Sequence, residues 1–256
     1  MLAETRRQAI VELLRASGSV TVGELEARFG VSSMTARRDL AELERQGLAR
    51  RTHGGAVLPA ISGHEDSFAS RVERDAEAKA ALAERAVTAV GAGEAIFLDS
   101  SSTAFFVARR ILERGVAVTL LTNSLPVMQL VASQSGPNVD LDGVGGTLRA
   151  LTQSFVGPHA VHTVKAHFAD RLFMSVKGVA ADGTLTDADP LEAEIKRAMI
   201  EQSAESTLLV DRSKLETRGL SAIAPLAAVS AVIAHGVGEP QLGVLTSARL
   251  VVTSAG

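Results

Sequence analysis

From residue 76 onward, short apolar runs alternate with longer stretches whose apolar residues recur at helical spacing. The runs typical of strands are 95–98, 116–122, 139–144, 171–176, 207–211, 229–234 and 250–253. The stretches that predict helices are 76–90, 103–114, 125–133, 189–204 and 239–247. Alternation of this kind is typical of a mainly parallel sheet with helices on its faces. The sequence therefore predicts an α/β domain over residues 76–256.

Composition narrows the classes of protein that this chain can belong to. Of the 256 residues 46% are hydrophobic, yet only 3% are aromatic and Trp and Tyr are absent, so the core must be aliphatic. The absence of Cys excludes disulfides, thiolate metal sites and a Cys nucleophile. Residues 1–7 are charged and no apolar run is long enough to span a bilayer. We therefore expect a cytoplasmic protein with no signal peptide and no membrane partner.

The first 57 residues follow a different pattern, in which three short helices precede a hairpin. The first helix is expected over 4–17, and the second begins at Thr21, where Glu24 completes a capping box. The third follows the N-cap Ser32, and a hairpin over 48–57 turns at Gly54-Gly55. This order predicts a winged helix-turn-helix over residues 1–57.

The third helix carries the residue types that read DNA. We expect Met34, Leu40 and Leu43 to face the core, and the other face to approach the major groove. Small hydroxyls allow a close approach and arginine binds guanine or phosphate, so the predicted reading residues are Ser33, Thr35, Arg37 and Arg38. The hairpin adds Arg50, Arg51 and His53. The alternative is a solvated helix whose arginines pair with Asp39 and Glu42.

The charge distribution agrees with a DNA-binding end. Residues 1–57 hold nine Arg, no Lys and seven acidic residues, whereas the whole chain has a net charge of −3. A mildly basic end on an acidic body fits a DNA reader joined to another domain, although ordinary charge scatter is an equal alternative. The polar, aperiodic residues 58–75 are predicted to be the linker between the two.

The N-terminal residues resemble the signature of the DeoR family of regulators. The resemblance rests on the stretch from Val31 to Leu40, followed by Leu43-Glu44, Gly47-Leu48 and the stretch from Arg51 to Ala56. It implies a winged helix-turn-helix that binds a double-stranded DNA operator. Asp39 is expected to orient an arginine or to cap a helix, because phosphate repels a carboxylate.

Three polar loops follow predicted strands in the second part of the chain. They are Asp99 to Thr103, Thr122 to Ser124, and the segment with Gly145-Gly146. Loops at the carboxyl ends of parallel strands meet in one crevice, and a serine-rich loop that begins a helix can bind phosphate. Lys214 follows another strand and can neutralise a phosphate. The alternatives are a plain helix cap and a surface lysine.

The same blocks occur in DeoR-family order, together with Phe155-Val156-Gly157 and the stretch from Glu192 to Arg197. The resemblance implies a sensor domain similar to ribose-5-phosphate isomerase, with Ser100, Thr103 and Lys214 at a phosphate. The full set of expected effector-binding residues is Asp99, Ser100, Ser101, Ser102, Thr103, Asn123, Ser124, Gly145, Gly146, Lys177, Lys196 and Lys214. Whether Glu194 or Lys196 faces the crevice stays open.

One segment departs from both patterns. The isomerase's acidic catalytic segment would fall at residues 175–178, where there is no Asp or Glu. Lys177 also departs from the Gly- and Asp-containing segment that is common in the family. A lysine at this position suggests an effector with a second anionic group, although a solvent-facing Lys177 is an equal alternative. The missing acids favour a sensor over an enzyme.

Three functions compete on the sequence. The first is a regulator, most simply a repressor of carbohydrate-metabolism genes, that responds to a phosphorylated sugar. The second is a sugar-phosphate isomerase-like enzyme with an accessory DNA-binding domain. The third is a metal-dependent regulator using His159, His162 and His167, which lack supporting Cys or carboxylate ligands. We expect the first, with no metal, no cofactor and no enzymatic activity. We also expect a homodimer or homotetramer, with residues 222–232 at the contact.

Overall fold

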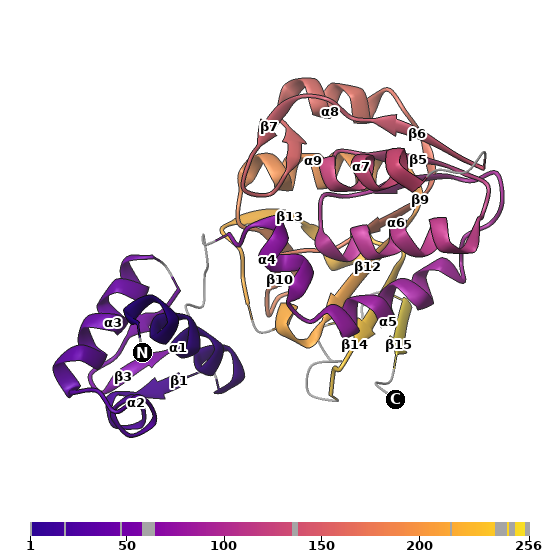
Figure 1. Cartoon of the computed structure of the whole chain (residues 1–256). Helices are drawn as coiled ribbons and strands as arrows, with labels where there is room; N and C mark the ends of the chain where they lie inside the picture. Colours follow the sequence, from indigo (N-terminus) through magenta and orange to yellow (C-terminus); the bar gives the residue numbers. More distant parts are fainter. Residues whose placement is uncertain are drawn as a thin grey trace. The chain divides into compact units, whose positions relative to one another are not determined.

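A computed structural model describes residues 2–17, 19–46, 48–57, 65–134, 138–215, 217–238, 245 and 249–253. The chain divides into two compact units, Met1–His64 and Glu65–Gly256, which we call unit 1 and unit 2. Both appear in Figure 1, and each is described by itself. The predicted boundaries 1–57, 58–75 and 76–256 stay predictions, and residues 58–64 of the expected linker lie outside the described residues.

Unit 1 is a winged helix-turn-helix, as the sequence predicts. Its helices are α1 (Ala3–Ser17), α2 (Val22–Phe29) and α3 (Ser33–Arg45). The strands β1 (Ser19–Thr21), β2 (Arg50–Arg51) and β3 (Gly55–Val57) form an antiparallel sheet in the order β1-β3-β2. The sequence pattern did not reveal β1, because three residues are too short to show a period of two.

Local chemistry sets the ends of these elements. Thr21 and Glu24 form the expected capping box, and Ser32 caps α3 by accepting from the Thr35 N–H. Gly30 ends α2 with a φ of 61°, a conformation that glycine adopts without strain. At Gly55 a Cβ would lie only 1.9 Å from the Val20 carbonyl oxygen, so only glycine allows β3 to pair with β1 here.

The core of unit 1 contains Leu40 and Leu43 as expected, but the expectation for Met34 was wrong. Met34 is 75% exposed, whereas Ala36, Leu40 and Leu43 are buried. A helix turns about 100° per residue, so those three residues share one stripe and Met34 lies nearly opposite it. Met34 therefore belongs to the exposed face that also carries Arg38.

Unit 2 is built on a seven-stranded parallel sheet in the order β15-β14-β12-β9-β4-β5-β6. All six neighbouring pairs are parallel, which confirms the seven predicted strands. In that order the strands are Arg249–Thr253, Ala231–His235, Ser203–Asp211, Ala169–Met174, Ala95–Leu98, Val118–Thr122 and Val139–Gly143.

Helices cover both faces of this sheet (Figure 1). One apolar cluster joins the sheet to α5 (Ala76–Val87), α6 (Ser102–Arg114) and α7 (Leu125–Gln134). The other joins it to α8 (Pro158–Lys165) and α9 (Pro190–Glu201). Within β4, Ile96 and Leu98 enter the first cluster and Phe97 the second, because side chains alternate across a strand. Of the expected helix 239–247, only Leu245 is described.

Several smaller elements decorate the sheet and were not predicted. An antiparallel pair links β7 (Thr147–Arg149) to β8 (Ser154–Val156). A second small sheet contains β10 (Gly178–Val179), β11 (Thr184–Asp187) and β13 (Ser221–Pro225). Two single-turn helices are η1 (Arg212–Lys214) and η2 (Leu226–Ala228). Within the expected linker, α4 (Phe68–Glu73) is helical and belongs to unit 2. No helix of the described residues is long and apolar enough to cross a membrane.

Candidate DNA-reading face and candidate ligand crevice

The exposed face of α3 carries the residues expected to read DNA. Ser33, Arg37 and Arg38 are exposed, and Thr35 is half-buried with its hydroxyl 3.1 Å from that of Ser32. Neither Arg37 nor Arg38 has a hydrogen-bond or ion-pair partner within the described chain. Their guanidinium groups are therefore available to an external anion.

The two acids suggested as alternative partners for these arginines are engaged elsewhere. Asp39 is buried, and its Oδ2 accepts from the Arg6 Nε at 2.6 Å, which ties α3 to α1. Glu42 pairs with Arg45, and hydrogen bonds from Arg45 and Gln46 lower the pKa of Glu42 to about 2. Asp39 thus orients an arginine, as expected, but one from α1.

The wing presents its basic residues in two different states. Arg50 and His53 are exposed and have no partner among the residues that the structure describes. Arg51 is also exposed, but its Nε lies 2.7 Å from Glu44 Oε2, and its backbone N–H bonds to the same carboxylate. The hydrogen bonds from Arg51 lower the pKa of Glu44. A phosphate must compete with Glu44 for Arg51 but not for Arg50.

In unit 2, Asp99 lies at the carboxyl end of β4 and anchors the serine-rich loop. Its Oδ1 accepts from the Ser101 N–H at 3.1 Å, and its Oδ2 accepts from the Ser175 N–H at 3.2 Å. The buried Lys196 of α9 lies 3.2 Å from the same Oδ2 and donates to the Ser175 carbonyl at 2.8 Å. Lys196 also binds Asp187 Oδ2 of β11 at 2.7 Å. Four segments therefore meet at one ammonium group.

Both partners of the Lys196–Asp187 pair are charged. Burial disfavours the ammonium of Lys196, but Asp187, Asp99 and Glu192 outweigh it and raise the pKa of Lys196. Burial likewise opposes ionisation of Asp187, but Lys196 outweighs it and holds the pKa of Asp187 below its ordinary value. The pair is a fixed part of the crevice wall, since removing one charge would strand the other.

A second network surrounds Glu192 on the first turn of α9. Its Oε2 accepts from the Ser100 hydroxyl at 2.9 Å, and its Oε1 accepts from Ser154 and, at 3.0 Å, from Arg149. Arg149 also binds Glu65, and Asp189 at 3.1 Å. Hydrogen bonds to Glu65 are the main reason that the pKa of Arg149 is raised. We call the set Asp99, Arg149, Asp187, Glu192 and Lys196 the crevice cluster.

Sequence reasoning found only part of the crevice cluster. Asp99 and Lys196 were expected, whereas Arg149, Asp187 and Glu192 were given no role. The spacing of four between Glu192 and Lys196 places both on one helix face and was the usable signal. The structure settles the question that the spacing left open, because Lys196 is buried and Glu194 is exposed.

The serine-rich loop and the loop after β5 lie next to this cluster. Ser101 caps α6 by accepting from the Ala104 N–H at 3.0 Å, and Ser102 and Thr103 are buried in the first turn. Ser124 forms an isolated bridge with Ser154. Asn123 is fully buried and donates to the Phe155 carbonyl at 3.0 Å, while its Oδ1 has no donor within the described chain.

The remaining expected residues lie at different depths. Gly145 and Gly146 are exposed and precede β7, and the β7–β8 pair brings Arg149 and Ser154 to Glu192. Lys177 is half-buried, two residues beyond Ser175 at the end of β9. Lys214 is half-buried in η1, close enough to the buried Lys79 to help lower its pKa.

Two other features offer less chemistry. Among the described residues no group of three His, Cys, Asp or Glu side chains could hold a metal ion, and the only carboxylate near His167 there is Asp142 at 3.2 Å.

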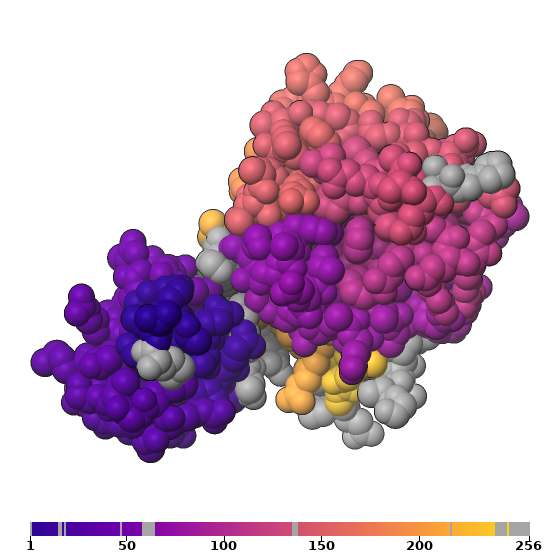
Figure 2. Space-filling view, in the orientation of Figure 1, coloured from indigo at the N-terminus to yellow at the C-terminus, as the bar shows by residue number. Residues whose placement is uncertain are grey.

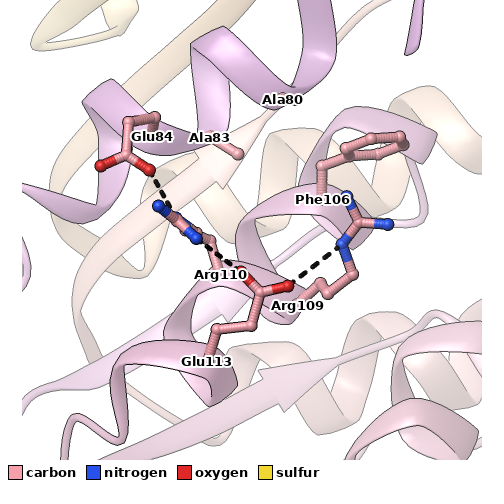
Figure 3. Close-up of a pocket in the computed structure, with 7 residues that line it drawn as sticks. All are labelled: Ala80, Ala83, Glu84, Phe106, Arg109, Arg110 and Glu113. Atoms are coloured by element: carbon pink, nitrogen blue, oxygen red, sulfur yellow. Dashed lines mark hydrogen bonds and ion pairs between the residues drawn. The ribbon is translucent and has the colours of Figure 1, made fainter. Parts of the chain in front are cut away.

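A pocket of about 260 Å³ lies between α5 and α6 (Figure 3). There Arg109 stacks on Phe106 at 4.6 Å, and Arg110 pairs with Glu84 and Glu113. Its charges are already neutralised.

The crevice also contains the acids that residues 175–178 lack. Asp99, Asp187 and Glu192 come from β4, β11 and α9 and surround the backbone of Ser175 and the Lys196 ammonium. They are separated in sequence by up to 93 positions, so no local pattern announces them. The lack of acidic residues at 175–178 therefore does not mean that the crevice lacks carboxylates.

A winged helix whose reading helix carries arginines unpaired within the described residues, joined to an α/β unit with polar residues gathered at the carboxyl ends of its strands, defines a DNA-binding regulator with a sensor domain. The model of the DeoR-like helix-turn-helix domain matches residues 6–61, and that of the DeoR C terminal sensor domain matches residues 74–235. The chain belongs to the DeoR family of transcriptional regulators.

Relatives of known name match over most of their length. The HTH-type transcriptional regulator GlpR of Haloferax volcanii is 35% identical over 92% of this chain and 91% of its own. The lactose phosphotransferase system repressor of Streptococcus mutans is 32% identical over 91% of this chain and 92% of its own. Ribose 5-phosphate isomerase A of Methanocaldococcus jannaschii is similar at 20% identity, with 55% of each chain covered and a TM-score of 0.40.

Proposed function

We propose that this DeoR-family regulator represses carbohydrate-metabolism genes, and that a phosphorylated sugar releases it from its operator. The observation that carries the proposal is the convergence of Asp99, Ser100, Glu192 and Lys196 at the carboxyl ends of parallel strands. Ligands bind at this edge in open α/β sheets. The S. mutans relative, named lactose phosphotransferase system repressor, supports the same direction of regulation.

The two halves of a sugar phosphate require different surroundings. The carboxylates of the crevice cluster accept hydrogen bonds from sugar hydroxyls but repel a phosphate. The phosphate therefore binds at the first turn of α6, where Ser102 and Thr103 lie, since N–H groups at a helix start attract anions. Lys214, and Lys177 if a second anionic group is present, supply positive charge. Asn123, Ser124 and the Gly145-Gly146 turn border the sugar.

The DNA half of the proposal uses the exposed face of unit 1. Ser33, Thr35, Arg37 and Arg38 contact base edges and phosphates in the major groove, and Arg50, Arg51 and His53 contact the backbone or the minor groove. One reading helix covers too few base pairs for useful specificity, so the active form is a homodimer or homotetramer. In the 222–232 segment Ala222, Pro225, Ala227 and Ala228 are exposed and suit a subunit contact.

Paired DNA titrations test the proposal. A thermal-shift screen of phosphorylated sugars first identifies a compound that stabilises the full chain, because a ligand of the native state raises its stability by mass action. Operator affinity is then measured with and without that compound. Lys214→Ala should keep operator affinity and lose the response, while Lys165→Ala, an exposed lysine paired with Glu201, should keep both.

Each unfavourable result has its own meaning. A Lys214→Ala protein that responds like the wild type would place the phosphate elsewhere, and one that no longer binds DNA would make Lys214 structural. A wild type whose operator binding responds to no phosphorylated sugar contradicts the sensing function. Light scattering that shows only monomers, with and without DNA, contradicts the proposed assembly.

An isomerase-like enzyme remains the second candidate, because three carboxylates and an ammonium share the crevice, and such groups can move protons. The ion pair of Lys196 with Asp187 disfavours it, because it raises the pKa of Lys196 and lowers the pKa of Asp187, so neither group readily exchanges a proton. An assay of ribose 5-phosphate conversion by the purified chain separates the two functions. Turnover by the purified wild type would establish the enzyme, and no turnover would favour the regulator alone.

A further inference from the structure

Arg71 of α4 forms no ion pair with any described residue. Its Nε is buried and has no acceptor, and its only hydrogen bond there is a long one, 3.4 Å from Nη2 to the Thr152 carbonyl. By contrast, Arg149 binds three carboxylates, and Arg74 on the same helix pairs with Asp66 at 2.7 Å. A buried donor without an acceptor costs free energy, so the fold must gain from keeping it.

The position of Arg71 is fixed by packing. Its guanidinium lies 5.7 Å from the centre of the Phe68 ring, and that ring packs edge-on against Phe105 of α6 at 5.6 Å. The Phe68 N–H donates to the Leu151 carbonyl at 2.9 Å. Figure 2 shows the band formed by α4 and α5 on the surface of unit 2. The helix is thus held on α6 and on the turn between β7 and β8.

From this position the guanidinium reaches a residue that is bonded to the crevice cluster. Thr152, whose carbonyl it reaches, has its hydroxyl 2.8 Å from Ser154, and Ser154 donates to Glu192. Burial raises the pKa of Asp187, and Arg71 is close enough to add to the larger effect of Lys196 that lowers it. Arg71 therefore lies at the edge of the crevice cluster, next to α6.

Two more cations lie on that side. Lys79 of α5 is buried, and its ammonium donates to the Arg71 carbonyl at 2.8 Å and to the Arg74 carbonyl, which fixes the end of α4. Burial, and next the charge of Lys214, lowers the pKa of Lys79 to about 8. Lys79 of α5 and Lys214 of η1 are thus two mutually repelling cations next to the end of α4, where Asp211 and Asp75 already supply negative charge.

We propose that Arg71 binds the anionic group of the ligand, so that α4, which follows residues 58–64, forms part of the ligand site. This inference rests on the proposed function and deepens it. Guanidinium presents a planar pair of N–H donors that matches two oxygens of a phosphate. The crevice then has an acidic wall for hydroxyls and a basic rim for the phosphate. A ligand that contacts both the acidic wall and the basic rim would connect α4 to the sheet. Ligand binding would thereby affect the segment that precedes Glu65.

The test uses inorganic phosphate as the probe and the full chain as the protein. Titration calorimetry measures phosphate binding by the wild type, Arg71→Gln, Arg71→Lys and Arg109→Gln. The last is the matched control, because Arg109 also stacks on a phenylalanine of unit 2 but lies away from the crevice. We expect Arg71→Gln to weaken phosphate binding about tenfold or more, the loss typical of one charge-assisted hydrogen bond.

The variants separate a binding role from a structural one. Arg71→Lys keeps the charge but loses the planar pair of donors, so we expect a smaller loss, while Arg109→Gln should bind like the wild type. If Arg71→Gln does not fold, as judged by circular dichroism, wild-type affinity in a folded Arg71→Lys overturns the proposal. Wild-type affinity in a folded Arg71→Gln, or no phosphate binding by the wild type, also overturns it.

A parallel DNA titration distinguishes this failure from failure of the proposed function. A wild type whose operator binding responds to a phosphorylated sugar, together with an Arg71→Gln protein that responds equally, removes only Arg71 from the site. A wild type whose operator binding responds to no phosphorylated sugar removes the proposed function as well.

Discussion

The two units of this chain place their charged side chains in opposite ways. In unit 1, Arg37, Arg38 and Arg50 are exposed and have no partner within the described residues. In unit 2, Lys196 and Arg149 each hold two or three carboxylates in a largely buried crevice. Exposed cations bind a phosphate backbone with little desolvation, whereas buried pairs are fixed by the cost of separating them.

The exposed arginines of unit 1 are therefore available to a partner, whereas the buried charges of unit 2 already bind one another. Unit 1 uses a buried pair only for architecture, where Arg6 and Asp39 join α1 to α3. Unit 2 uses its pairs to shape a crevice, and a ligand must either leave them intact or replace them. Arg71 of unit 2 resembles the arginines of unit 1 in forming no ion pair with a described residue, and its buried Nε has no acceptor there.

The largest effect should come from breaking the central pair of unit 2. Lys196→Met leaves Asp187 and Asp99 buried without their cation, so we expect unit 2 to lose about 3–5 kcal/mol of unfolding free energy. Because the chain has no Trp, hydrogen exchange of the β9 and β12 amides under native conditions is the readout. Glu194→Gln, on the exposed side of α9, should change nothing. Unchanged protection in Lys196→Met would show that the pair is not fixed by burial.

The next effect tests the exposed arginines of unit 1. Arg37→Ala should weaken operator binding by about 1–3 kcal/mol, the range for one arginine that contacts a base. Thermal unfolding should stay unchanged, since the side chain has no intramolecular partner in the described chain. Arg45→Ala, whose guanidinium is held by Glu42, is the control in a mobility-shift titration. Equal affinity in Arg37→Ala and wild type would remove Arg37 from the reading face.

A smaller effect should distinguish the two arginines of the wing. Arg50→Ala should reduce the slope of log affinity against log salt concentration by about 1, as expected for one lost phosphate contact. Arg51→Ala should reduce it by less, because Glu44 already holds that guanidinium. Fluorescence anisotropy over a series of salt concentrations measures both slopes. A larger reduction for Arg51 would mean that the Glu44 pair opens on DNA.

The last effect concerns Lys79, whose pKa is lowered to about 8 from 10.5 by burial and by Lys214. Below pH 8 its charge costs the folded state free energy, and between pH 8 and 10.5 the unfolded chain binds more protons, so stability rises with pH across this window. Asp211 and Asp75 oppose the shift, and Arg74 adds to it. Urea midpoints should therefore rise relative to Lys79→Met over this range. Parallel curves would show that Lys79 is not perturbed.

Sequence patterns predicted the elements of regular structure well, for a physical reason. Strands buried on both faces need continuous apolar runs, so all seven strands of the sheet could be recognised, and side chains such as Thr21 and Ser32 mark helix starts by local bonds. Short edge strands such as β1 and β10 were not predicted, because two or three residues cannot show the alternation of a strand. Met34 was misplaced, since an apolar residue in the first turn of a helix says little about which face is buried.

By itself, the sequence determined the order of the seven strands of the main sheet, the family and the arginine face of α3, because each depends on residues close together in the chain. Only the tertiary structure decided which charges meet. Asp99, Asp187 and Lys196 come from three elements, and the position of Arg71 depends on how α4 packs against Phe105. Such pairings arise where strand ends and helix ends converge, and burial then fixes them, so no spacing along the chain can announce them.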